Sequence, residues 1–283
     1  MNFVKTYMPS SDKKIALFCG ALRLPFIVRD CLRQRGFDVY VIGLKNFYDP
    51  ALQPDLVVRL GGGGVAAREC KKRGIKKLVF AGALGHVNLS DIRPDMWSMS
   101  VFMRVLANQK GANSMLSTAI AGIESKGFKI VGAQELCPDL AFQPGIQTRV
   151  KPTREDRKTI DRAVQVSKMI GAEDIGQSVV VDRQVLAIEA AEGTTKMFQR
   201  VIEVKNQGAT PLERKAQSGI FAKMTKPNQD LRVDLPAIGV DTVRDVTAAR
   251  LRGIVVNAGT CLVIDRDQVV TAADKAGIFI IAV

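Results

Sequence analysis

The chain has 283 residues, with 41 Lys and Arg against 28 Asp and Glu, so its formal net charge is +13. Hydrophobic residues make up 47% of the chain and charged residues 24%, which excludes a disordered or low-complexity protein. The length suits one large or two medium domains. The sequence has no apolar run of 18 residues, and its first residues lack the apolar stretch of a signal peptide. We therefore expect neither a membrane-spanning helix nor export.

The positive charge points to an anionic partner: nucleic acid, an acidic membrane face or a phosphorylated ligand. Basic residues are densest at 71–77 and 149–158 and are otherwise spread along the chain. One Trp and three Tyr do not supply the stacking surface of a nucleic-acid binder, so we expect no specific nucleic acid. Solvated helix faces are the simplest explanation of the charge, and an anionic lipid or a nucleotide is the alternative.

The cysteines and the single histidine exclude several kinds of site. Five Cys residues are scattered and none has C-x-x-C spacing. The sequence therefore predicts neither a zinc site nor a disulfide framework, and it favours a reducing cytosol. His86 is the only histidine, so a histidine-rich metal site is excluded. We interpret His86 as a loop residue that hydrogen-bonds its neighbours.

In the first half of the chain, short apolar runs alternate with helical patterns. The predicted strands are 14–18, 39–42, 56–60, 78–80 and one from 129, and the predicted helices are 26–34, 61–72, 95–108 and 112–125. This alternation favours parallel strands joined by right-handed crossovers. We therefore predict an α/β protein whose first half is a Rossmann-like, doubly wound sheet.

The second half begins after a segment rich in Pro and Gly, 137–152, which predicts a linker or a domain crossing. Thr153 is then the predicted N-cap of a helix, with Asp156 completing a capping box. The predicted strands are 179–181, 185–190, 219–224, 253–259, 261–265 and 278–283, and two further helices are 242–252 and 268–276. Because some strands form hairpins, we expect a mixed sheet. The predicted domains are 1–136 and 137–283, with a cleft between them.

Glycine-rich phosphate loops give only a weak signal. The Walker pattern and a strict G-x-G-x-x-G are both missing. The run Gly61 to Gly64 does follow a strand and open a helix, where free N–H groups can bind phosphate. A turn of this kind more often serves backbone geometry.

Polar residues gather in loops of the second half. Gly193, Thr194 and Thr195 stand at a predicted helix start, where they suit a phosphate oxygen or simply cap the helix. Lys223, Lys226 and Arg232 supply enough positive charge to neutralise a diphosphate.

An acidic residue follows this group of cations. If residues 232–234 are extended, Arg232 and Asp234 point to the same face. Asp234 is then placed to hold a divalent metal or orient a water. A surface ion pair is the alternative.

These loops carry a family resemblance. D-I-G-Q at 174–177, E-A-A-E-G-T at 189–194, A-K-x-x-K-P at 222–227 and R-V-D-L-P at 232–236 resemble the bacterial UDP-2,3-diacylglucosamine pyrophosphatases of lipid A synthesis. The form meant is the metal-dependent one that is not a metallophosphoesterase. The likeness runs through most of the chain.

The resemblance implies a two-domain cytosolic enzyme, peripheral at the inner membrane face, that hydrolyses UDP-2,3-diacylglucosamine to UMP and 2,3-diacylglucosamine 1-phosphate. It implies Mg²⁺ or Mn²⁺ as cofactor, with Asp234 as the essential, metal-binding acid. The implied substrate-binding residues are Gln177, Glu192, Gly193, Thr194, Thr195, Lys223, Lys226 and Arg232. Partners are the lipid nucleotide sugar and an anionic membrane face, and a homo-oligomer is left open.

Methionines at helical spacing raise a further question. Met96, Met99 and Met103, together with Val101, Phe102 and Val105, can line a cleft for the acyl chains, because Met adapts to irregular shapes. Such a stripe is more often plain core, and we expect core here.

The chain also departs from the family pattern. The usual G-G-G-x-L-P is here G-A-L-R-L-P from Gly20, the acid after E-G-T is Thr195, and an acidic pair is replaced by Ala112 and Asn113. Lost acids weaken metal binding or reflect a different sugar or acyl chain. The alternative function is therefore a weakened paralogue that binds a lipid-linked nucleotide sugar without turnover.

Overall fold

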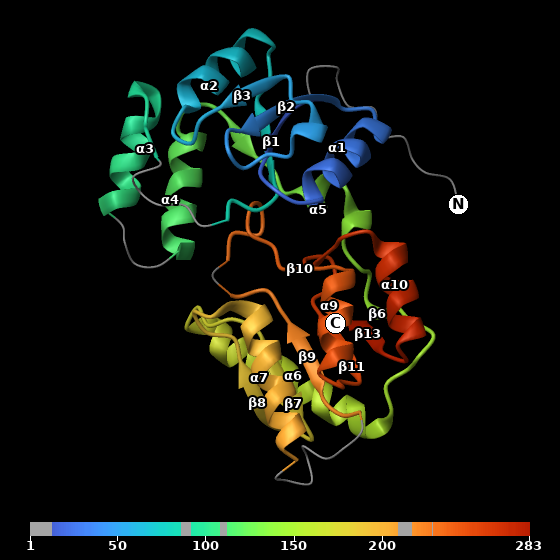
Figure 1. Ribbon diagram of the computed structural model, residues 1–283. Coiled ribbons are helices and arrows are strands. Elements are labelled where there is room, and N and C mark those ends of the chain that lie inside the picture. Colours follow the sequence, from blue (N-terminus) through green and yellow to red (C-terminus); the bar gives the residue numbers. More distant parts are fainter. Residues whose placement is uncertain (1–12, 86–91, 108–111, 209–216, 228) are drawn as a thin grey trace. The chain divides into compact units, whose positions relative to one another are not determined.

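Five parallel strands form the first sheet of the computed structural model, which describes residues 13–85, 92–107, 112–208, 217–227 and 229–283. Their order is β3-β2-β1-β4-β5, and Figure 1 labels β1, β2 and β3 of this sheet. The strands are β1 (Lys14–Cys19), β2 (Asp38–Leu44), β3 (Leu56–Val58), β4 (Lys77–Ala81) and β5 (Lys129–Ile130). The chain adds β2 and β3 on one side of β1 and then β4 and β5 on the other side. This is the order of a doubly wound sheet, so the prediction of a Rossmann-like first half is confirmed.

Helices connect these strands. They are α1 (Leu24–Gln34), α2 (Gly63–Lys72), α3 (Met96–Ala107), α4 (Ala112–Glu124) and the short α5 (Ala133–Leu136), with a 3₁₀ turn at Pro50–Leu52. Local sequence explains their ends: Pro25 stands in the first turn of α1, and Gly36, at φ +79°, takes the left-handed backbone that ends it. Buried side chains such as Ile42, Leu78 and Ile130 form the core between sheet and helices.

The second sheet has six strands in the order β6-β13-β11-β9-β7-β8. They are β6 (Gly145–Ile146), β7 (Ser178–Val181), β8 (Gln184–Ile188), β9 (Ile220–Lys223), β11 (Gly253–Val256) and β13 (Phe279–Ala282). β9, β11 and β13 run parallel, whereas β6, β7 and β8 pair antiparallel with their neighbours. The predicted mixed sheet is therefore confirmed. A separate parallel pair joins β10 (Ala237–Ile238) to β12 (Leu262–Val263).

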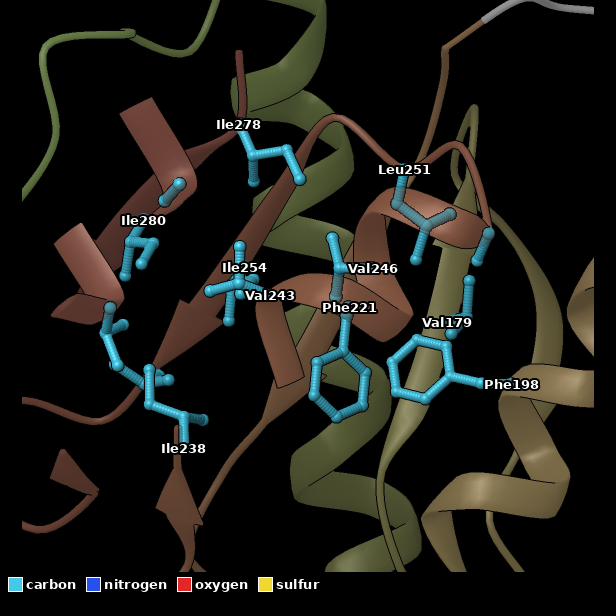
Figure 2. Close-up of a cluster of buried hydrophobic side chains, with 14 of the residues drawn as sticks. Val179, Phe198, Phe221, Ile238, Val243, Val246, Leu251, Ile254, Ile278 and Ile280 are labelled. Atoms are coloured by element: carbon cyan, nitrogen blue, oxygen red, sulfur yellow. The ribbon is translucent and has the colours of Figure 1, made fainter. Parts of the chain in front are cut away.

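The helices around this sheet are α6 (Arg154–Ala172), α7 (Gly193–Gln207), α9 (Val240–Ala248) and α10 (Arg266–Lys275). The predicted capping box starts α6, because Thr153 Oγ1 accepts from the Asp156 amide at 3.2 Å and the Thr153 amide donates to Asp156 at 2.8 Å. Figure 2 shows the core, in which Phe198 of α7 lies against Phe221 of β9 with ring centroids 4.8 Å apart. No described helix is long and apolar enough to cross a membrane.

The segment predicted as a linker is packed structure. Phe142 is completely buried, and β6 extends the second sheet by pairing with β13. Pro138–Leu140 forms a 3₁₀ turn. The linker prediction is wrong because Pro and Gly mark turns and edge strands as readily as open linkers.

The expectation of no disulfide is also wrong. Cys31 of α1 and Cys137 form a disulfide with a Cα–Cα distance of 6.4 Å. They are 106 residues apart in the sequence, so spacing gave no sign of the pair. The other three cysteines are free and buried.

The chain forms two structural units. Unit 1 comprises Met1–Cys137 and Asp230–Val233, and unit 2 comprises Pro138–Gln229 and Asp234–Val283. Residues 230–233 thus belong to the first unit, although they stand in the second half of the sequence. The cleft expected between two domains stays a prediction.

Candidate active site

Polar loops of unit 2 converge at one end of its sheet. The carboxyl ends of β9 and β11 lie side by side because their strands are parallel. β7 starts and β8 ends at this same edge, since Ser178 pairs with both Ala222 and Ile188. The carboxyl edge of parallel strands is the usual place for ligands in α/β sheets. The topology therefore brings Gln177, Lys223 and the loop after β8 to one place.

Glu189, directly after β8, is the centre of a hydrogen-bond network. Its carboxylate accepts the Gln177 backbone N–H at 3.0 Å and the Thr194 hydroxyl at 2.7 Å. The Gln177 side-chain oxygen in turn accepts the Met224 amide at 3.0 Å. Three of the predicted site loops are thereby held in register with one another.

The loop after β9 is anchored by two further side chains. Asn257, directly after β11, accepts the Thr225 backbone N–H at 2.7 Å and its hydroxyl at 2.9 Å. The Lys226 ammonium donates to the Asp174 carbonyl and carboxylate oxygens, each at 2.8 Å. Lys226 is therefore already paired with an acid of the neighbouring predicted loop.

The start of α7 supplies backbone donors. The helix begins at Gly193, so Thr194 and Thr195 belong to its first turn, as predicted. Gly193 has φ +81° and open space where a Cβ would stand. Glu192 is turned back onto the helix, where it pairs with Arg200 at 2.9 Å.

Lys223 ends β9 and is half-buried. Its ammonium has no hydrogen-bond or ion-pair partner in the described part of the chain. Burial raises the pKa of the neighbouring Cys261 thiol to about 12, and the Lys223 charge partly offsets that rise. Lys223 is thus a cation available to an anionic ligand.

Arg232 belongs to unit 1. Its guanidinium pairs with Asp230 at 2.7 Å and with Glu124 of α4 at 2.8 Å, and the hydrogen bonds that it donates to these carboxylates, that to Asp230 above all, raise its pKa above the ordinary range. Residues 231–233 form a turn, so the expected extended segment is wrong. Local hydrogen bonding explains this, because the Val233 amide donates to the Asp230 carbonyl at 3.2 Å.

Asp234 is the residue at which the chain re-enters unit 2, and it is half-buried. Its carboxylate forms no hydrogen bond or ion pair with any residue that the structure describes. Pro236, two residues on, is buried and accepts the Leu262 amide at 2.8 Å, which anchors the corner. Within the described ranges, no three His, Cys, Asp or Glu side chains gather as a metal-binding group.

The structure thus joins Gln177, Thr194 and the 223–226 loop by direct contacts, but it records no contact that adds Arg232 or Asp234 to them. Sequence reasoning missed Glu189 and Asn257 as positioning residues. Each is a polar residue that directly follows a strand, and that position was the available signal.

Two features of unit 1 bear on the predicted phosphate loop. The amides at the start of α2 are used internally, since Gly63 donates to Ser98 at 3.0 Å and Gly64 donates to Asp95 at 2.7 Å. The glycine run therefore serves backbone geometry. Leu22 has φ +74° and is 72% exposed, so a leucine occupies left-handed backbone in the loop where the family usually has glycine.

Some predicted positions lie outside the described structure. His86 falls in the segment 86–91, and the side chains of Ala112 and Asn113 are likewise not described. The predictions for these positions stay predictions.

Comparisons with known proteins show the family of the chain. The model of the LpxI N-terminal domain matches residues 14–140, and that of the LpxI C-terminal domain matches residues 143–281. The UDP-2,3-diacylglucosamine pyrophosphatase LpxI of Caulobacter vibrioides is 35% identical over 275 residues, covering 96% of this chain and 98% of that protein. The chain therefore belongs to the LpxI family, both of whose domains it carries.

Proposed function

We propose that this chain hydrolyses the pyrophosphate bond of UDP-2,3-diacylglucosamine, giving UMP and 2,3-diacylglucosamine 1-phosphate for lipid A synthesis. The observation that carries the proposal is the match to a curated pyrophosphatase over 98% of that protein's length. Both domains of the family are present in order, so the chain has the two-domain arrangement of the family.

The substrate is a diester of pyrophosphate, whose negative charges repel an incoming water. Lys223 is the cation best suited to offset them, because it is half-buried at the sheet edge and lacks an acidic partner among the described residues. The amide of Thr194, at the start of α7, offers a donor to a phosphate oxygen, whereas the Gly193 amide already donates to the Ala190 carbonyl at 3.3 Å. Gln177 and Glu189 act as positioning residues that hold these loops together.

Asp234 is proposed as the essential acid and as the ligand of Mg²⁺ or Mn²⁺. Mg²⁺ is commonly held by one or two carboxylates together with substrate phosphates, and a single unpaired, half-buried carboxylate fits that mode. A metal so bound would polarise a phosphoryl oxygen and lower the pKa of a bound water. Asp234 would fix its position, and Lys223 would neutralise the remaining phosphate charge.

Turnover of a defined substrate tests the proposal. Purified protein is incubated with UDP-2,3-diacylglucosamine in detergent with Mg²⁺ or Mn²⁺, and UMP is measured by chromatography. We expect UMP and the lipid phosphate in equal amounts, and loss of both after a chelator is added. Bound but intact nucleotide would instead support the alternative, a paralogue that binds without turnover.

The cellular setting follows from the substrate. A diacylated sugar resides in a bilayer while its nucleotide faces water, so we place the enzyme at the cytoplasmic face of the inner membrane, bound peripherally. The net charge of +13 favours such an anionic surface.

A further inference from the structure

Exposed apolar side chains are concentrated in one region of unit 1. Five of the ten large hydrophobic residues that are exposed in the described chain belong to β3, α2 and α3: Val57, Val65, Met96, Met99 and Met103. Isolated exposed hydrophobic residues are ordinary, but a gathered patch marks a contact surface. We call these five residues the apolar patch.

Helix α3 explains why the methionines stay outside. Its residues 97, 101 and 105 form the side that packs on the unit: a Cβ on Gly63 of α2 would lie 2.8 Å from the Trp97 ring, and one on Gly122 of α4 would lie 2.9 Å from Val101. The opposite side carries Met96, Met99 and Met103, which are 96%, 44% and 56% exposed. The expectation that this stripe is core is therefore wrong. The whole helix has no fully buried residue.

A hollow of about 570 Å³ adjoins the stripe. Val57, Val65, Met96 and Trp97 line it together with Arg59 and Arg68. Its one acidic lining residue, Asp95, is occupied by the amides of Gly64 and Ser98 at 2.7 and 2.8 Å. None of the predicted site residues lines this hollow.

Three arginines lie near the apolar patch. Arg59 and Arg68 border the hollow, and Arg104 is an exposed residue of α3 that follows Met103 in the sequence. All three are exposed, and none forms a hydrogen bond or ion pair with a residue in the described ranges. An apolar surface bordered by exposed cations is complementary to a bilayer with anionic head groups.

We propose that the apolar patch and its three arginines dock the protein onto an anionic lipid bilayer. The methionine side chains of α3 insert at the level of the head groups, and the guanidinium groups pair with lipid phosphates. Methionine suits this task because its flexible side chain adapts to a fluid surface. The choice of a bilayer over a protein partner rests on the proposed function, whose lipid substrate is a bilayer component.

Vesicle sedimentation tests the docking surface directly. The full chain is mixed with vesicles of phosphatidylglycerol and phosphatidylethanolamine that contain no substrate, and with vesicles of phosphatidylcholine alone. We expect binding to the anionic vesicles, weakened by salt, and little binding to the neutral ones. Failure of the wild-type protein to bind anionic vesicles would overturn the proposal.

Substitutions locate the surface. The variant Met96→Ser/Met99→Ser/Met103→Ser is expected to bind at least tenfold more weakly, because it loses three apolar side chains that enter the membrane. The matched control replaces three exposed hydrophobic residues of unit 2, Met169→Ser/Ile175→Ser/Val185→Ser, and should bind as the wild type does. Equal binding by the two variants would place the contact elsewhere. Thermal unfolding of both variants checks that they are folded, and Met96→Ser alone affects only a side chain that is 96% exposed.

The arginines are tested in the same way. Each of Arg59→Gln, Arg68→Gln and Arg104→Gln should weaken binding about fivefold, since a basic residue near an anionic surface contributes about 1 kcal/mol. The control variants Arg154→Gln, Arg157→Gln and Lys168→Gln change exposed cations of α6 and should have no effect. Equal losses in both sets would indicate attraction by net charge alone and would contradict a docking patch.

Trp97 provides a local signal, because it is the only tryptophan of the chain and adjoins Met96 in the hollow. Anionic vesicles with brominated acyl chains should quench its fluorescence. Quenching only by monomeric brominated lipid would indicate an acyl-chain site and overturn bilayer docking. Failure of the proposed function is separable, since a chain that releases no UMP but binds vesicles through this patch leaves the docking surface intact.

Discussion

Among single residues of the candidate site, the polar groups are of two kinds. The side chains of Gln177, Glu189 and Asn257 accept hydrogen bonds from backbone and hydroxyl groups of neighbouring loops. Lys223 and Asp234 are half-buried and have no hydrogen-bond or ion-pair partner in the part of the chain that the structure describes. A half-buried charge without a partner is costly to stability, and such groups are typical of functional sites.

Asp234→Asn is therefore expected to abolish turnover while leaving stability unchanged or slightly higher. Loss of a metal or water contact in the transition state removes several kcal/mol, which corresponds to a rate lower by about a thousandfold or more. UMP release and thermal unfolding measure the two effects. Asp267→Asn on α10, an exposed aspartate, serves as the control. Near-normal turnover by Asp234→Asn would remove this residue from the mechanism.

Leu22 carries backbone strain that the site does not use. Left-handed backbone costs a leucine about 1 to 2 kcal/mol, so Leu22→Gly should raise the free energy of unfolding by about 1 kcal/mol, as measured by urea denaturation. Ile175→Gly, a loop hydrophobe outside the left-handed region, should do the opposite and destabilise by a similar amount, because glycine gains freedom in the unfolded chain. Equal destabilisation by both changes would contradict strain at Leu22.

Among the elements, α7 is fixed at its far end by a buried cation. Lys205 is 2% exposed, and its ammonium donates to the carbonyls of Ser218 and Arg250 at 3.0 and 2.8 Å. Burial is the main cause that lowers the pKa of Lys205 to about 8, and the nearby positive charge of Arg250 is a second cause. Because an unfolded lysine keeps its proton up to pH near 10.5, the unfolded chain binds more protons between pH 8 and 10.5. The contribution of Lys205 to stability therefore rises with pH across this range.

This linkage predicts a difference between the wild type and Lys205→Met. The free energy of unfolding of the wild type should rise relative to that of the variant by at most about 3 kcal/mol between pH 8 and 10.5. Urea denaturation at several pH values measures it. The buried thiols Cys19, Cys70 and Cys261, whose pKa values burial raises, act in the opposite direction but equally in both proteins. Parallel pH profiles would show that Lys205 titrates as an exposed lysine.

Individual elements also show how much of the fold is predictable from the sequence alone. Buried strands such as 14–19 and 279–282 are predictable because each is a continuous apolar run ended by polar residues or glycine. The pairing of β6 with β13 and the Cys31–Cys137 disulfide are not, because each joins residues more than a hundred positions apart. In the site, the loops after strands were predictable from their polar residues. The partners of Arg232 were not, because Glu124 is 108 residues away.

In the molecule as a whole, the chain enters unit 1 a second time just before Asp234. Three contacts within unit 1 hold this segment: Arg232 pairs with Glu124, Gln134 donates to the Leu231 carbonyl at 2.8 Å, and Val233 packs against the first core. Arg232 is thus a positioning residue in this structure, whereas the family resemblance implied a substrate ligand. The two roles make different predictions.

If Arg232 positions the loop, Arg232→Met and Glu124→Gln break the same contact and should lower turnover by similar factors, with the double variant little worse than either. A double-mutant cycle on unfolding should give a coupling of about 1 kcal/mol, the scale of a half-exposed ion pair. If Arg232 instead binds the pyrophosphate, Arg232→Met should raise KM far more than Glu124→Gln does. Measuring kcat and KM for the three variants decides between the roles. Glu203→Gln, on α7 of unit 2, controls for the loss of one acid.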